Sequence, residues 1–176
     1  MDTISEILKY TVPALIVLLT TWLVSRLYLK QIRDQQKHEL RLKYNTKTLP
    51  NRLQAYERLA LFLERITVDS LLVREQSAEM SARQFHQHLL AVIRKEYEHN
   101  LSQQVYVSDN VWSVVKNAKE GVIKMINTAA MQIEPDAHAL ELSKKIIDLQ
   151  MDVATSPTQA ALEFIRKEIR QVFGWI

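Results

Sequence analysis

The chain of 176 residues contains no cysteine and only two glycines, Gly121 and Gly174. The lack of cysteine excludes disulfides, thiolate catalysis, and zinc or iron–sulfur sites built on cysteine. Two isolated glycines do not make a glycine-rich phosphate loop of either the Walker or the dinucleotide-binding type. The sequence also has no serine in a nucleophile-elbow context and no HExxH motif. We therefore predict a non-enzymatic protein with no catalytic residue, no cofactor and no evident small-molecule substrate.

The positive charge of the chain is local. The formal net charge is +3, but residues 26–58 hold nine basic and three acidic side chains, whereas residues 59–176 hold thirteen and fifteen. A nucleic-acid-binding domain normally carries its own basic face. The near-neutral C-terminal part therefore argues against a nucleic-acid partner.

One uncharged run near the N-terminus predicts a membrane anchor. Tyr10–Ser25 carries no charge, and Ile7–Leu29 extends it with apolar flanks. Sixteen helical residues span roughly 24 Å, somewhat less than a hydrocarbon core of about 30 Å, so the flanks are needed. A cleavable signal peptide fits poorly because the start is acidic and no A-x-A-like site follows. A buried helix of a globular domain is the other alternative. We expect a single transmembrane helix within an anchor of residues 1–29.

Basic residues after this run set the expected orientation. Only Lys9 precedes the run, whereas seven basic residues follow it up to Lys47. The positive-inside rule then places the N-terminus outside and the rest of the chain in the cytoplasm, which in a bacterium means the inner membrane. Residues 30–48 form a predicted basic helical stalk. Six basic side chains at the anchor and on the stalk are candidates for contact with anionic lipid: Arg26, Lys30, Arg33, Lys37, Arg41 and Lys43. An ordinary charged flank with no further role is the alternative.

The remaining residues, 49–176, predict a four- or five-helix cytoplasmic bundle. Apolar residues recur at helical spacing throughout, with no strand pattern. The expected helices are 50–75, 81–99, 109–133, 135–153 and 157–173. Capping signals lie at Ser81 with Gln84, at Ser108, and at Ser156 before Pro157. Residues 105–107 fit either an extended segment or a helical turn. The fold class is therefore all-α, with one transmembrane helix, a stalk and a bundle.

The stretch from Leu49 to Ile66 is the strongest candidate for an interaction surface. It reads LPNRLQAYERLALFLERI, and its apolar stripe is wider than one helix face because Leu61 adjoins Phe62. The candidate surface residues are Leu53, Tyr56, Arg58, Leu61, Phe62 and Arg65. They predict contact with a protein partner or with a second copy of the chain, while a plain core helix is the alternative.

This block resembles a family of small bacterial proteins of unknown function. Members of that family carry an N-terminal membrane helix followed by an LP-x-RLQAYERL-x-LFLERI-like block. The resemblance covers most of the chain and implies the same architecture. It implies no activity and no catalytic residue.

A Glu-x-x-His pair provides one alternative function. Glu96 and His99 share a helix face, as do the ligands of di-iron bundles. A complete site needs a second such pair, and Glu134 with His138 has the wrong spacing. We therefore expect no metal site, and a helical-bundle metalloprotein remains the less favoured hypothesis.

Overall fold

The computed structural model describes residues 18–26, 28, 30, 49–77 and 79–174. The chain divides into two compact units, Met1–Leu49 and Pro50–Ile176. In the first unit residues 18–26 are helical, and the Arg26 guanidinium lies 5.0 Å from the centre of the Trp22 ring.

The predicted anchor and stalk fall mostly outside the described residues. This applies to residues 1–17 of the anchor and to four candidate lipid-contacting side chains: Arg33, Lys37, Arg41 and Lys43. No helix within the described residues is long and apolar enough to cross a membrane.

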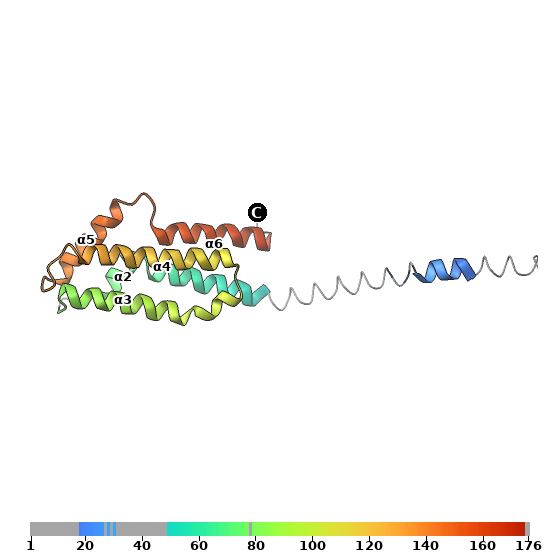
Figure 1. Ribbon diagram of the computed structural model, residues 1–176, viewed down its shortest axis with the longest axis horizontal. Helices are drawn as coiled ribbons and strands as arrows, with labels where there is room; N and C mark the ends of the chain where they lie inside the picture. Colours follow the sequence, from blue (N-terminus) through green and yellow to red (C-terminus); the bar gives the residue numbers. More distant parts are fainter. Residues whose placement is uncertain (1–17, 27, 29, 31–48, 78, 175–176) are drawn as a thin grey trace, which may run out of the picture. The chain divides into compact units, whose positions relative to one another are not determined.

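The second unit is all-α, as predicted. Its first element is a helix described over residues 49–65, of which residue 49 is the last of the first unit. The elements that follow are α2 (Val68–Glu75), α3 (Ala82–His99), the 3₁₀-helix η1 (Leu101–Val105), α4 (Asp109–Ala130), α5 (Ala139–Met151) and α6 (Pro157–Phe173). The helix of residues 49–65 runs beside α3, α4 and α6 along the long direction of this unit (Figure 1). α4 packs against α6 more extensively than against α5 and α3. Within the described residues β pairing is limited to one isolated bridge between Ser81 and His138.

The predicted helix over residues 50–75 is wrong in one respect, because it is broken at Ile66 and Thr67. Thr67 has extended backbone angles and begins α2 as its N-cap. Its hydroxyl donates to the Glu64 carbonyl at 2.8 Å, so the side chain satisfies the end of the first helix. Ile66, Thr67 and Val68 form a β-branched run, which lowers helix propensity locally. The break lets Ile66 and Val68 both reach the core.

The connection between α4 and α5 is longer than predicted. α4 ends at Ala130 instead of residue 133, and α5 begins at Ala139 instead of residue 135. The intervening loop pairs with the start of α3. Its carbonyls at Pro135 and Ala137 accept hydrogen bonds from the first two amides of α3 at 3.1 and 2.7 Å. These bonds satisfy α3 amides that have no partner within the helix, so the loop is held in a non-helical form.

The open question at residues 105–107 is resolved in favour of a helical turn. η1 ends at Val105, and a hydrogen-bonded turn follows at Tyr106. The preceding Asn100 is buried, and its side-chain amide donates from Nδ2 to the backbone carbonyl of Glu96 at 2.8 Å. This contact closes α3 and starts the tighter helix.

Two of the three predicted capping signals are confirmed in full. Ser81 and Gln84 form both hydrogen bonds of a capping box, and Ser108 accepts from the Val111 amide. Gly174 ends α6 with a positive φ of 67°, which glycine adopts without strain. Ser156 is the N-cap residue of α6 and Pro157 lies in its first turn, as predicted, but the Ser156 hydroxyl pairs with that of Thr158 at 2.9 Å instead of accepting from a helix amide.

Gly121 lies where α4 and α6 approach closely. A Cβ atom at this position would lie 3.0 Å from the Cβ and Cγ atoms of Pro157. The absence of a side chain therefore lets the first turn of α6 pack directly on α4.

Candidate interaction surface

The helix of residues 49–65 has one buried face and one exposed face. The buried side chains are those of Ala55, Tyr56, Leu59, Phe62 and Leu63. The opposite face is formed by six residues that are all exposed: Gln54, Glu57, Arg58, Leu61, Glu64 and Arg65. We call these six residues the outer face. Leu61 lies at its centre with 62% of its surface exposed, directly opposite the core.

The predicted surface residues divide between these two faces. Arg58, Leu61 and Arg65 lie on the outer face, and Leu53 is partly buried. The remaining two aromatic residues are corrections to the prediction. Tyr56 is 0% and Phe62 1% exposed, so both belong to the core and offer nothing to a partner. Their large apolar area is better satisfied inside the bundle, where Phe62 packs 5.9 Å from the ring of Tyr97.

The charges around Leu61 are separated by sign. A helix turns about 100° per residue, so residues three and four positions away surround Leu61. A line drawn through Leu61 parallel to the helix axis divides the outer face in two. Glu57 and Glu64 lie on one side of this line, and Arg58 and Arg65 lie on the other. Sequence reasoning missed the two glutamates, although their spacing to Leu61 was visible. The outward direction of the Leu61 side chain could not be inferred from the sequence, because it depends on which face of the helix the rest of the bundle buries.

One arginine of the outer face is held by α3. Arg65 Nη2 lies 2.9 Å from Glu96 Oε1, with 55% and 21% of the two side chains exposed. Exposed ion pairs contribute little stability, about 0–1 kcal/mol. None of the described residues pairs with the side chains of Glu57, Arg58 or Glu64. Three of the four charges around Leu61 therefore remain available to a partner.

The C-terminal end of this helix is well fixed. Arg74 on α2 donates from Nη1 to the Arg65 carbonyl at 3.2 Å. Burial alone would raise the pKa of Glu75, but hydrogen bonds from Arg74 and His88, together with their charges, hold it below its usual value. Glu75 thus joins α2 to α3. The outer face is consequently presented by a fixed backbone.

A polar network on the buried side ties this helix to α4 and α6. The Tyr56 hydroxyl donates to Glu168 Oε1 at 2.7 Å, and the Ser108 hydroxyl donates to Oε2 at 2.8 Å. Arg52 Nε donates to the Tyr106 carbonyl at 3.3 Å. The network fixes the position of the helix against its neighbours.

The Glu-x-x-His pair is not arranged as part of a metal site. The Glu96 carboxylate is engaged by Arg65. His99 is exposed at the end of α3. Within the described part of the chain, no three His, Cys, Asp or Glu side chains lie close enough together to hold a metal ion.

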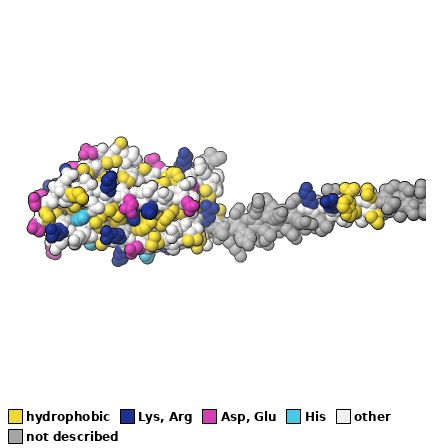
Figure 2. Space-filling view, viewed as in Figure 1, with side chains coloured by type: hydrophobic (Ala, Val, Ile, Leu, Met, Phe, Trp, Pro, Cys, Tyr) yellow, Lys and Arg dark blue, Asp and Glu magenta, His cyan; other side chains and the backbone are white. Residues whose placement is uncertain are grey.

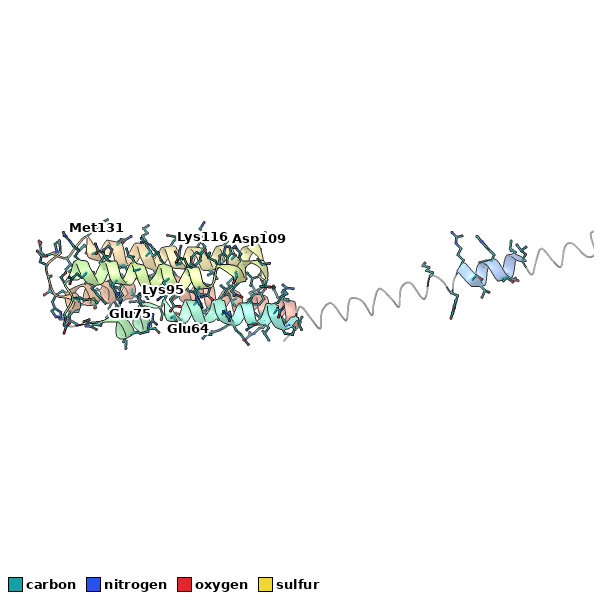
Figure 3. All side chains as sticks on the ribbon, turned by 90° about the horizontal axis from the view of Figure 1, so that it is seen from below. Glu64, Glu75, Lys95, Asp109, Lys116 and Met131 are labelled. Carbon is teal, nitrogen blue, oxygen red and sulfur yellow. The ribbon has the colours of Figure 1, made fainter. Side chains whose placement is uncertain are left out.

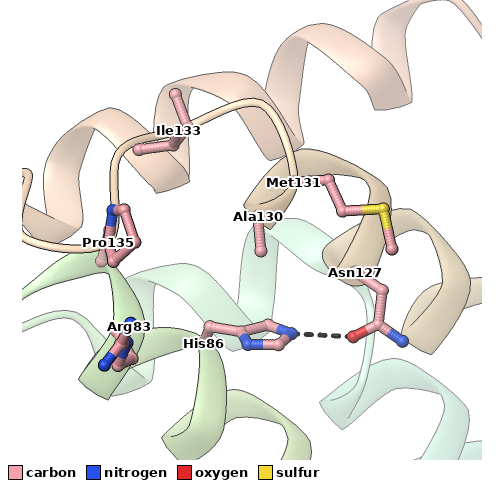
Figure 4. A pocket seen from close by; sticks show the side chains of 8 residues that line it. Arg83, His86, Asn127, Ala130, Met131, Ile133 and Pro135 are labelled. Atoms are coloured by element: carbon pink, nitrogen blue, oxygen red, sulfur yellow. Dashed lines mark hydrogen bonds between the residues drawn. The ribbon is translucent and has the colours of Figure 1, made fainter.

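A pocket of about 260 Å³ lies at the C-terminal end of α4. Figure 4 shows it between the first turns of α3, the last turn of α4 and the loop that follows. Its lining is mostly apolar, and His86 Nε2 lies 2.7 Å from Asn127 Oδ1 along one side. Arg83 lines it, but Glu134 and Asp136 are exposed next to the loop's Pro135, so the surrounding charge is mixed.

Charge over the rest of the domain is also mixed. Basic and acidic side chains are interspersed on the face shown in Figure 2, with apolar side chains between them. This agrees with the near-neutral composition of residues 59–176. Of the six candidate lipid-contacting residues, only Arg26 and Lys30 are described, and both lie in helical segments of the first unit.

Comparison with curated proteins and with solved structures finds no match to either. The pattern of one protein family, described as a family of unknown function (DUF7935), matches residues 2–172. This match covers nearly the whole chain. The chain therefore belongs to the DUF7935 family.

Proposed function

We propose that this protein is a non-enzymatic, membrane-anchored helical interaction protein. Residues 7–29 form its transmembrane helix, residues 30–48 its basic stalk, and residues 49–176 its cytoplasmic domain. The outer face of the helix of residues 49–65 is the surface that contacts a protein partner.

The observation that carries the proposal is the position of Leu61. An exposed leucine is ordinary by itself. Leu61, however, is 62% exposed at the centre of a fixed helix face and is surrounded by four charged residues sorted by sign. Interfaces commonly combine an apolar centre with a charged rim that gives specificity. The outer face matches this pattern on a small scale.

Membrane anchoring is supported by composition. Tyr10–Ser25 carries no charge, and seven basic residues follow within the next 22 positions. An uncharged run of this length is close to the minimum for a span, and the basic excess marks the cytoplasmic side. Tyr10 and Tyr28 stand near its two ends, where interfacial aromatic residues are expected.

Membrane fractionation tests the anchor. The full-length protein should stay with the membrane pellet in high salt and in alkaline carbonate, and only detergent should release it. Release by salt alone would overturn the transmembrane proposal, because salt screens surface charges but does not extract a spanning helix. That result would favour the alternative in which the basic residues, including Arg26 and Lys30, bind anionic lipid.

Single-cysteine labelling tests the orientation. The chain has no cysteine, so each introduced thiol is unique. Ser5→Cys should react with an impermeant maleimide added to intact cells. Glu79→Cys, at an exposed position after α2, should react only after the cells are permeabilised. The opposite labelling pattern would reverse the proposed topology.

A further inference from the structure

We infer that the partner of the outer face is a second copy of this chain, with the two helices of residues 49–65 running parallel about a two-fold axis. The inference rests on the proposed function and names the partner of that same surface. Its basis is the arrangement of the four charges around Leu61.

A parallel two-fold pair brings opposite charges together. When two identical helices face each other in parallel, the axis runs along the helices, and the left side of one meets the right side of the other. Arg65 then faces the partner's Glu64, and Arg58 faces the partner's Glu57. Both contacts occur twice, because the two-fold axis repeats them. Leu61 meets the partner's Leu61 at the centre.

An antiparallel pair centred on Leu61 has the opposite result. The two-fold axis then runs across the helices, and each side meets the same side of the partner. Arg65 faces the partner's Arg58, and Glu64 faces the partner's Glu57. Like charges across an interface are unfavourable and select against that arrangement. The sorting of charge by side therefore specifies the direction of pairing as well as the partner.

The contact with Glu96 is compatible with this pairing. A guanidinium group has five N–H donors, and the Glu96 contact in the structure is made through Nη2. Arg65 can therefore hold Glu96 and still present donors to the partner's Glu64. The ion pair also limits the rotamers of Arg65 before association. Less side-chain entropy is then lost when the pair forms.

A parallel pair also suits two chains anchored in one membrane. Both copies enter the domain at Pro50, and a parallel arrangement places the two Pro50 ends together. An antiparallel arrangement separates them by the length of the helix. The outer face is small, so pairing in dilute solution should be weak. Short tethers raise the effective concentration to the order of millimolar, which allows a weak face to pair.

Disulfide trapping in membranes containing the full-length chain tests the inference. Gln54 lies on the outer face seven residues before Leu61, almost in line with it. In a parallel pair Gln54→Cys and Leu61→Cys should each form a disulfide-linked dimer under mild oxidation. In an antiparallel pair the two Gln54 positions would lie about 21 Å apart, at 1.5 Å per residue over fourteen residues.

Met131→Cys is the matched control. Met131 is 86% exposed, and it lies on the other side of the bundle from Glu64 in the view of Figure 3. It should give a dimer yield at least several-fold lower than Gln54→Cys. Equal yields at both positions would indicate random collisions and overturn the inference. A dimer at Leu61→Cys without one at Gln54→Cys would also overturn it.

Charge exchange in the Gln54→Cys background provides a second test. Glu57→Arg places arginines on both sides of Leu61 and should reduce the dimer yield several-fold. Adding Arg58→Glu restores opposite charges across the pair and should restore the yield. Both side chains are exposed and unpaired within the described residues, so neither change disturbs the core. An unchanged yield with Glu57→Arg would refute the charge argument.

These results are separable from those for the proposed function. If fractionation shows a spanning protein but Gln54→Cys does not dimerise, the anchor stands and self-pairing fails. If Gln54→Cys dimerises but the protein is released by salt, self-pairing stands and the transmembrane anchor fails.

Discussion

The substitution Tyr56→Phe tests the buried network that positions the outer face. Tyr56 is 0% exposed, and its hydroxyl donates to Glu168 at 2.7 Å, where Ser108 supplies the second donor. Phenylalanine keeps the ring and its edge-on contact with Phe173, whose centre lies 6.3 Å away. The change therefore removes the hydroxyl and little else. The network joins the helix of residues 49–65 to α4 and α6, so its loss should weaken the whole domain.

The expected loss follows from the type of hydrogen bond. A hydrogen bond to a charged acceptor contributes about 1.5–3 kcal/mol to folding. Glu168 keeps the Ser108 donor in the variant, so its carboxylate is not left without a partner. We therefore expect Tyr56→Phe to lower the free energy of unfolding by about 1.5–3 kcal/mol at neutral pH.

The same residue gives a prediction at alkaline pH. Burial raises the pKa of Tyr56, and the hydrogen bond and charge of Glu168 raise it further, from 10.0 to about 12, against a smaller opposing effect of Arg52. Between pH 10 and 12 the unfolded chain has lost this proton while the folded chain keeps it. Stability that is fully present below pH 10 is therefore lost as the pH rises towards 12. At 1.36 kcal/mol per unit, two units set an upper bound of about 2.7 kcal/mol.

Urea denaturation of the full-length protein in detergent measures both effects. Tyr106→Phe is the matched control, because Tyr106 is 43% exposed and its hydroxyl has no described partner. The control should change stability by less than about 0.5 kcal/mol. The difference between wild type and Tyr56→Phe should also shrink above pH 10. The reasoning would be refuted if Tyr56→Phe and Tyr106→Phe were equally stable. It would also be refuted if the stability difference between wild type and Tyr56→Phe stayed constant above pH 10.

Two further substitutions test the packing of the bundle. Gly121→Ala should destabilise the domain by about 1–3 kcal/mol despite the better helix propensity of alanine, because its Cβ meets the Cβ and Cγ atoms of Pro157 at 3.0 Å. Thermal unfolding should show a lower midpoint than wild type, and an equal or higher midpoint would contradict the packing argument. The Glu75 pKa is lowered from 4.5, so its stabilising contacts with Arg74 and His88 should be lost as the pH falls below about 4.5. Glu75→Gln should unfold with a weaker dependence on acid pH, and an unchanged acid profile would contradict this.

Features that depend on local sequence were predictable. The capping box at Ser81 and the glycine at the end of α6 use residues within a few positions of each other, so the sequence alone indicates them. The helical spacing of apolar residues likewise indicated an all-α domain. The break at Thr67 was local as well, but the apolar stripe continued through it and concealed the β-branched run.

Features that depend on distant contacts were not predictable. Tyr56 and Glu168 are 112 residues apart, and no spacing rule connects them. The loop after α4 is non-helical because its carbonyls bind the start of α3, which lies more than 50 residues earlier. Tyr56 and Phe62, two of the predicted surface residues, are buried instead of exposed. Burial by α3, α4 and α6 decides which side of that helix faces outward.

The same burial gives the outer face its significance. A helix that packs on three neighbours has one fixed direction left for contact, and in this domain that direction is centred on Leu61. One leucine and four exposed charges make too small a surface to capture a dilute partner, because exposed ion pairs contribute only about 0–1 kcal/mol each. They are sufficient for partners that are already held close together. Since Pro50 directly follows the proposed stalk in sequence, the helix of residues 49–65 would be the first part of the domain to meet if two copies are tethered as proposed. Under the proposed anchoring, a weak, charge-sorted face at this position would therefore favour pairing between neighbouring copies in one membrane over binding of a free protein.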